Sequence, residues 1–443
     1  MAGADLTSVR DMLHEHFTGK NIVDIFYRAE KEIAPIMAAL DAEADTGEGF
    51  GRALITPIIY GTGESVGADL AKVQAKAASA TVGASALYTR WEQTPVTVSG
   101  TCQWARDAMD AAIGKSSGET FKVMATEMDT KMVAMRNRYA YHAVGTGDGR
   151  LGVIVAVGAG GTAPTNYIQV GTDVINRFHR GMDISVATTP GTGSCRVAQG
   201  GVTQEHMLVL GTDPNNGYVY LDANPKDTTS SRTAWAATDV IFNYNDRAAG
   251  SLTYILPQGL AGWLPGPSVV DSSQWNKVTR DGISELAGLT SDCATLEPED
   301  AFLKTLKILF TQGGTKADAL FCSANDYTAF VSGKDKSKIV QISLGKYEIG
   351  FEGMTVNSLA GSVPVIPDAN LTDGEFYAGP FKNPKLKPRL VYVGDLVQID
   401  NKDGLDFRLV AGAAAYQMQL YSRGNIALPG PGKFIRGYGL SVS

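Results

Sequence analysis

The clearest pattern of hydrophobic and polar positions lies over residues 118–144. Large apolar side chains recur there at steps of three and four, the spacing that places them on one face of an α-helix. This stripe consists of Phe121, Met124, Met128, Met132, Met135, Tyr139 and His142. Ser116 and Glu119 have the spacing of a capping box, and Gly145 is a stop signal. The pattern predicts one helix of about 40 Å, at roughly 1.5 Å per residue. A methionine stripe can line a ligand site, but packing in a core is its far commoner use.

Two segments rich in β-branched and aromatic residues precede this helix, at residues 52–60 and 87–98. Pro57 and Pro95 lie inside them, and a proline cannot donate to a strand ladder, so we expect two edge strands. Two facing edge strands form a ribbon, and an isolated ribbon is only marginally stable in water. The alternative is a pair of ordinary strands in a globular sheet, joined by a long loop. The ribbon hypothesis requires a second copy of the protein to hold it.

Residues 61–83 connect the two arms and are rich in glycine and alanine. Such small side chains bury little area, so we expect a tip that contacts neighbouring copies and not a core of its own. The residues predicted to form this assembly interface are Thr62, Gly63, Gly67, Lys72, Lys76, Tyr88, Arg90 and Trp91.

The rest of the chain divides by pattern. Residues 1–45 have helical periodicity, with a bend expected near Pro35. Residues 151–262 contain short strand-like runs separated by turn residues, which predict a small barrel or sandwich. Asp213 to Gly217 is a strong hairpin loop within this part. Residues 263–443 are mixed. A helix is predicted to begin at Pro298 and to end at Gly313, and several strands follow it. Its apolar face is predicted to consist of Phe302, Leu303, Leu306, Leu309 and Phe310.

Composition narrows the class of protein. The chain has 443 residues, 44% of them hydrophobic and 19% charged, so it can bury sizeable cores. Its formal net charge of -7 argues against a surface that grips nucleic acid tightly, although loose contact through one face is compatible with it. Four scattered cysteines without a CxxC pair indicate free thiols. The sequence has neither a secretory signal nor an apolar run that approaches the ~18 residues of a membrane span.

Two motifs suggest chemistry, and each has a simpler explanation. Residues 63–67 match GxSxG, the nucleophile elbow of α/β-hydrolases, with Ser65 as the nucleophile. The preceding strand carries Pro57, and no alternating strand–helix pattern surrounds the motif, which disfavours a hydrolase. Residues 114–116 resemble the end of a phosphate-binding loop, but Met109 replaces its first glycine and residues 104–112 are expected to be helical.

Metal and cofactor sites are not predicted. The ligand spacings of zinc sites are absent. The loop at Asp213 lacks the glutamate that would close a calcium site. The sequence therefore offers no credible catalytic site, and we expect a protein that is not an enzyme.

Three local segments carry a resemblance to a known family. Residues 415–427, AYQMQLYSRGNIA, resemble the closing strand of tailed-phage major capsid proteins. Residues 88–93 and 96–100 resemble the return arm of their extended E-loop, and residues 181–186 resemble the start of an inserted β-barrel module. The resemblance covers nearly the whole chain and depends on the order of parts more than on any single motif.

The resemblance implies the α+β Hong Kong 97-type (Johnson) fold. Residues 1–45 would be the helical N-terminal arm, residues 46–100 the E-loop ribbon, and residues 101–150 would carry the spine helix of the peripheral domain. Residues 151–262 would be the inserted β-barrel-like module. Residues 263–443 would supply the remainder of the peripheral domain and the axial domain.

The implied function is a structural one. Such proteins self-assemble into hexamers and pentamers of an icosahedral phage head that encloses double-stranded DNA, assembled in the host cytoplasm. The expected partners are the protein itself, separate scaffold and portal proteins, a decoration protein, and DNA through weak non-specific contact; no membrane is expected. Two alternatives remain at this point, an encapsulin-like nanocompartment shell and, with less support, a serine hydrolase using Ser65. No covalent cross-link is predicted, because Lys72 and Lys76 have no recognisable partner.

Overall fold

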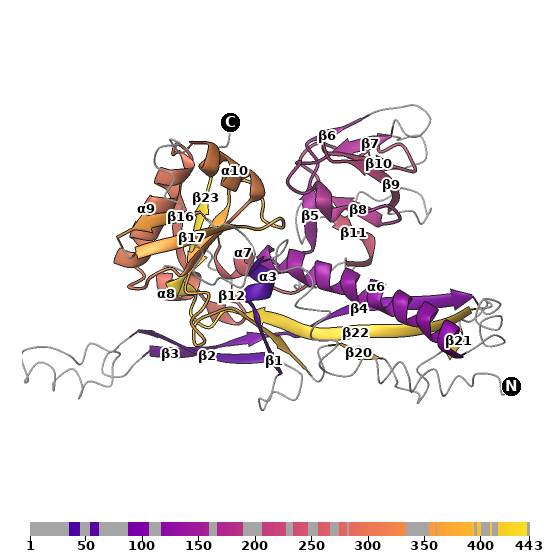
Figure 1. Ribbon diagram of the computed structural model, residues 1–443, viewed down its shortest axis with the longest axis horizontal. Helices are drawn as coiled ribbons and strands as arrows, with labels where there is room; N and C mark the ends of the chain where they lie inside the picture. Colours follow the sequence, from indigo (N-terminus) through magenta and orange to yellow (C-terminus); the bar gives the residue numbers. More distant parts are fainter. Residues whose placement is uncertain are drawn as a thin grey trace, which may run out of the picture.

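The computed structural model describes residues 35–44, 54–61, 87–105, 117–158, 166–188, 206–226, 234–246, 256–265, 274–280, 283–333, 354–359, 361–393, 397–399, 408–409 and 415–440. A long helix lies along a sheet that contains two long strands, and a two-stranded ribbon and two smaller bodies are attached to this frame (Figure 1). The predicted α+β class is confirmed.

The long helix, α6 (Ser117–Val144), agrees with the predicted spine to within one residue. It lies along the strands β4 (Val96–Ala105) and β22 (Ala415–Ala427) (Figure 1). Side chains of β4 alternate between buried and exposed, as in a strand with one covered face. At Gly100 the helix approaches so closely that an added Cβ would lie 3.4 Å from the Met135 sulfur. The Tyr139 hydroxyl lies 3.1 Å from Ser422 Oγ and joins the helix to β22.

Strand β22 is the centre of the six-stranded body sheet. Along one edge it pairs antiparallel with β4. Along the other edge it pairs in succession with β19 (Arg389–Tyr392), β20 (Gln398–Ile399) and β21 (Arg408–Leu409). Strand β1 (Asp41–Ala44) extends the sheet by parallel pairing with β19. Strand β22 therefore joins β4, from the first quarter of the chain, to three strands from its last quarter.

A second six-stranded sheet forms one of the two attached bodies. Its order is β14 (Leu289–Asp292), β23 (Ile435–Tyr438), β18 (Phe376–Gly379), β15 (Ala319–Cys322), β17 (Gly361–Pro367) and β16 (Thr355–Ser358). Helices α9 (Pro298–Thr311) and α10 (Ala324–Gly333) pack against it. Proline at the first turn of α9 confirms the predicted helix start. Phe310, predicted on the apolar face of α9, is 40% exposed, so that assignment is wrong. One helical step separates it from buried Leu309 and turns it toward solvent.

The other attached body is a seven-stranded sheet. Its order is β5 (Arg150–Val153), β11 (Val240–Asn243), β8 (Asp183–Ala187), β9 (Met207–Asp213), β10 (Tyr218–Leu221), β7 (Tyr167–Gln169) and β6 (Ala156–Val157). The two end strands, β5 and β6, follow each other directly in the chain. Between them, Ile154 N donates to Asp239 O beside β11, and Val155 N donates to Gln169 O of β7, so this one segment bonds to both sides of the sheet. The sheet is thus closed into a small barrel around its own apolar core. We call this body the β-module (residues 150–246).

The remaining elements are short. They are α3 (Pro35–Ala39), η1 (Ile175–Arg177), η2 (Tyr244–Asp246), α7 (Leu260–Trp263), β12 (Gln274–Trp275), β13 (Val278–Thr279), α8 (Ser284–Ala287) and η3 (Pro431–Lys433).

Two sequence-based expectations about secondary structure are wrong within the described residues. Residues 41–44 are a strand and not helix, because β19 offers them a sheet edge. Trp104 and Ala105 end strand β4 instead of starting a helix, because ten residues of β22 pair with that strand. In both cases a partner distant in sequence overrides local propensity. The predicted segment boundaries stay predictions.

Candidate assembly site at the root of the ribbon

The ribbon consists of β2 (Leu54–Gly61) and β3 (Leu87–Gln93), paired antiparallel from Leu54↔Gln93 to Gly61↔Leu87. Within the described part of the chain, neither strand belongs to another sheet. Figure 1 shows the ribbon at the lower left, beside one end of the body sheet and below the body that contains α9. The predicted return arm is shorter than expected, because Val96 and the residues after it belong to β4 in the body sheet.

The root of the ribbon is buried in the protein's own core. Trp91 is 0% exposed, and its ring lies edge-on to that of Trp263, with ring centroids 5.1 Å apart. The prediction that Trp91 forms an assembly interface is therefore wrong for this residue, because a neighbouring subunit cannot reach a side chain that its own chain covers. Trp91 anchors the ribbon instead.

A buried polar network surrounds these two rings. The amide of Gln93 donates from Nε2 to Gln258 Oε1 at 3.0 Å and to Ile426 O at 2.9 Å. Trp263 Nε1 donates to the same carbonyl at 2.8 Å. Asn425 Oδ1 accepts from the backbone nitrogens of Gln258 and Ile426, each at 2.8 Å. Since buried polar groups are costly without partners, this network ties the ribbon root to β22 and to the segment before α7.

The other predicted interface residues have separate positions. Arg90 points away from the core, with 65% of its side chain exposed, and pairs with Glu92 at 2.9 Å. Tyr88 lies in β3 opposite Ile59. The remaining predicted residues lie outside the described part of the chain, as does Ser65 of the hydrolase hypothesis; they are Thr62, Gly63, Gly67, Lys72 and Lys76.

The structure places the predicted methionine stripe between α6 and the body sheet. Met124, Met128, Met132, Met135 and Tyr139 are all at most 3% exposed and belong to one apolar core. Phe121 lies in α6, and its side chain is outside the described set. Trp91 and Trp263 belong to the same core, so the helix and the ribbon root are packed into one apolar cluster.

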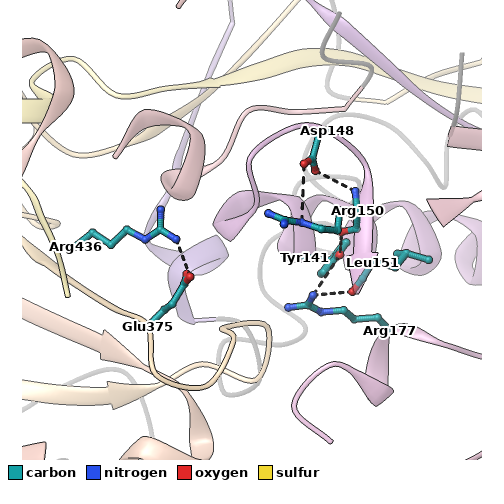
Figure 2. A network of polar contacts seen from close by, with 7 residues as sticks. All are labelled: Tyr141, Asp148, Arg150, Leu151, Arg177, Glu375 and Arg436. Carbon is teal, nitrogen blue, oxygen red and sulfur yellow. Dashed lines mark hydrogen bonds and ion pairs between the residues drawn. The ribbon is translucent and has the colours of Figure 1, made fainter. Parts of the chain in front are cut away.

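A second junction joins the β-module to the rest of the protein. Figure 2 shows Arg177 of η1 beside Tyr141 of α6, with the guanidinium 4.4 Å from the ring centroid. Arg177 donates to Leu151 O and to Asn370 O, both at 2.8 Å. The Tyr141 hydroxyl in turn donates to Arg150 O. One cation thus contacts the spine helix, the β-module and the loop at residues 368–374, which we call the junction loop.

Buried carboxylates hold both ends of the junction loop. Asp368 Oδ2 accepts from Ile36 N at 3.0 Å at the start of α3, and Asp368 Oδ1 accepts from Asn370 N at 2.9 Å. At the other end, Asp326 Oδ2 accepts from Gly374 N at 3.1 Å. Burial raises the pKa of Asp368 and the pKa of Asp326 to about 6, and the hydrogen bonds only partly oppose this shift. No local sequence signal marks these carboxylates or the root residues Trp263, Gln258 and Asn425, since their partners are distant in sequence.

The raised pKa of Asp368 predicts a pH dependence of stability. Its folded pKa of about 6 exceeds its ordinary value of 3.8, so its contribution is fully present below pH 3.8 and is lost as pH rises through 6. We expect this group to make the free energy of unfolding about 1 kcal/mol larger at about pH 5 than at about pH 7.5. Urea unfolding of Asp368→Asn should lack this part of the difference, whereas Asp300→Asn, at an exposed position, should retain it. Equal pH dependence in wild type and Asp368→Asn would contradict the prediction.

The described residues contain no group of three or more potential ligands that could hold a metal ion. None of the helices in the described ranges is long and apolar enough to cross a membrane.

Comparison with known proteins finds alignments to solved structures. No protein-family model and no curated protein matches the chain. The solved "Cyanophage A-1(L) capsid asymmetric unit" aligns over 94% of this chain and 95% of its own, with 8% identity and a TM-score of 0.47. The "Capsid of empty GTA particle" aligns over 90% and 94%, with 9% identity and a TM-score of 0.41. An encapsulin of Synechococcus elongatus aligns over 81% and 79%, with 8% identity and a TM-score of 0.36. All three alignments extend over most of this chain, at 8–9% identity and with TM-scores below 0.5.

Proposed function

We propose that this protein is the major capsid protein of a tailed phage and builds the hexamers and pentamers of an icosahedral head around double-stranded DNA. The observation that carries the proposal is the ribbon of β2 and β3, which leaves the body as a separate two-stranded sheet from a deeply buried root. A monomeric protein gains little from such an extension. A shell subunit uses it to cover a neighbour.

The energetics of an isolated ribbon support this function. Two strands without a third partner or a covering layer are marginally stable in water and expose backbone groups to aggregation. The root, in contrast, has a complete core around Trp91 and Trp263. A firmly anchored root with an extension that pairs with no third strand among the described residues is what intersubunit contact requires, because the neighbour supplies the missing surface. Closure of the shell then makes several modest interfaces, each of roughly 1,600 Å², act together.

The partners follow from this role. The protein itself is the main partner, and separate scaffold and portal proteins and a decoration protein complete the head. A formal net charge of -7 suits a shell that encloses DNA with weak, non-specific contact. Assembly takes place in the host cytoplasm, and the mature protein resides in the virion.

The deciding experiment removes the tip of the ribbon. Deletion of residues 62–83 is expected to leave a folded subunit, since the described cores contain none of these residues, and to abolish closed particles in negative-stain images. A matched control replaces the same residues with a glycine–serine segment of equal length, which restores chain length but not the side chains; we expect it to fail in assembly too. Normal closed particles from either variant would contradict the proposed role of the tip.

Two measurements separate the alternatives. Nuclease-resistant DNA inside native particles distinguishes a phage head from an encapsulin-like compartment that encloses proteins. A fluorophosphonate label that disappears in Ser65→Ala would support the hydrolase alternative, and absence of labelling in wild type would remove it.

A further inference from the structure

A strained hairpin lies directly against the ribbon root. Strands β12 and β13 pair through Trp275↔Val278, which leaves Asn276 and Lys277 as the two turn residues. Both have left-handed backbone conformations, with φ of 48° and 66°. A two-residue turn of this kind ordinarily carries glycine at its second position, because a side chain there is strained. Lys277 therefore occupies a position where stability alone would favour glycine.

The strained turn contacts one residue of the ribbon. Glu92, next to buried Trp91, donates from its backbone nitrogen to Asn276 O at 3.2 Å. The Lys277 ammonium donates to Glu92 Oε2, while Arg90 pairs with Glu92 Oε1 at 2.9 Å. The Lys277 hydrogen bond is the main cause that lowers the pKa of Glu92, so this carboxyl is ionised over the neutral range. Backbone and side chain of the turn thus hold the same ribbon residue.

The hairpin itself is held by a buried apolar residue and by buried hydrogen bonds. Val278 is buried in the main core, and the next residues lead to Arg280, which is 2% exposed. Arg280 donates to Gly262 O at 3.0 Å and to Trp263 O at 3.1 Å. Trp263 is the residue that packs against Trp91. The hairpin and the ribbon root therefore both contact Trp263. The Lys277–Glu92 pair connects them a second time, at the surface.

Stability does not explain why lysine occupies this turn position. Lys277 is 71% exposed, and exposed ion pairs contribute little to folding. Glu92 lies between buried Trp91 and buried Gln93, and Arg90, the next residue outward from Trp91, pairs with the same carboxylate. The Lys277–Glu92 pair therefore restrains β3 at the point where the ribbon leaves the core. We propose that Lys277 is a positioning residue that fixes the direction of the ribbon for contact with a neighbouring subunit. The proposal depends on the assembly function proposed above.

Lys277→Gly tests this inference, because it removes the pair and relieves the backbone strain together. Its Tm should be equal to wild type or a few degrees higher. The yield of closed particles should nevertheless fall about tenfold, which corresponds to about 1.4 kcal/mol. Glu92→Gln should show the same assembly defect with the turn unchanged. Lys277→Arg keeps the cation and should assemble with the yield of wild type.

A second measurement does not depend on assembly. Spin labels at Thr89→Cys on β3 and Lys307→Cys on α9 report the distance between ribbon and body in the free subunit. Wild type should give a narrow distance distribution, and Lys277→Gly a broader one. If Lys277→Gly assembles at wild-type yield with an unchanged distribution, the inference is wrong. If wild type itself forms no closed particles, the proposed function fails, and the distance distributions still decide whether Lys277 positions the ribbon.

Discussion

Met128→Asp is expected to remove most of the free energy of unfolding of the main body. Met128 is 1% exposed in the core between α6 and the body sheet. A carboxylate there is removed from solvent among apolar side chains, so the chain must bury a charge, keep a proton on the carboxyl, or open the core. We expect a loss of about 5 kcal/mol or more, a large share of the 5–15 kcal/mol that typically holds a domain together. Urea unfolding and the soluble fraction after expression measure this loss.

Two variants of the same helix serve as controls. Met128→Leu keeps the volume and polarity of the side chain and should cost less than about 1.5 kcal/mol. Ala134→Asp places the same new charge on an exposed position of α6 and should change stability by about 0.5 kcal/mol. A soluble Met128→Asp subunit with the Tm of wild type would show that the methionine stripe does not pack against the sheet.

Trp91→Ala is expected to cost about 3–5 kcal/mol and to release the ribbon root. Trp91 is completely buried against Trp263, so removal of its side chain leaves a cavity at the root of the ribbon. Unlike a change at the ribbon tip, this substitution should impair both folding and assembly. Urea unfolding gives the stability loss. Faster amide exchange of β2 and β3 than in wild type would reveal the loosened root.

Conservative substitutions at the two rings separate packing from hydrogen bonding. Trp91 Nε1 has no hydrogen-bond partner among the described residues, so Trp91→Phe should cost only about 1–2 kcal/mol for lost packing. Trp263 Nε1 donates to Ile426 O, so Trp263→Phe loses that bond in addition to packing area. Equal stability of wild type and Trp91→Ala would mean that the root is not part of the core.

Local pattern was sufficient where neighbouring residues decide the structure. The spine helix follows from the spacing of its methionines, and α9 follows from Pro298 and the acids in its first turn. The hairpin between β9 and β10 follows from the turn chemistry at Asp213, whose carboxylate accepts from Asn215 N and Asn216 Nδ2. In each case the interactions join residues at most a few positions apart.

Local pattern failed where a distant segment supplies the partner. Trp91 resembled an exposed aromatic on a ribbon, and only the approach of Trp263 makes it a core residue. Trp104 resembled part of a helix until β22 provided a strand to pair with. The carboxylates of Asp368 and Asp326 had no visible role, because their partners on α3 and the junction loop come together only in the folded chain.

The sequence by itself determined the elements whose free energy comes from short-range periodicity and turn chemistry, and the α+β class. The tertiary structure alone decided which face of the ribbon root is buried and which strands pair with β22. It alone also brings Lys277 into contact with Glu92. The physical reason is that periodicity records only whether a side chain prefers water or a core. Which residues fill that core depends on chain segments that the sequence separates and folding brings into contact.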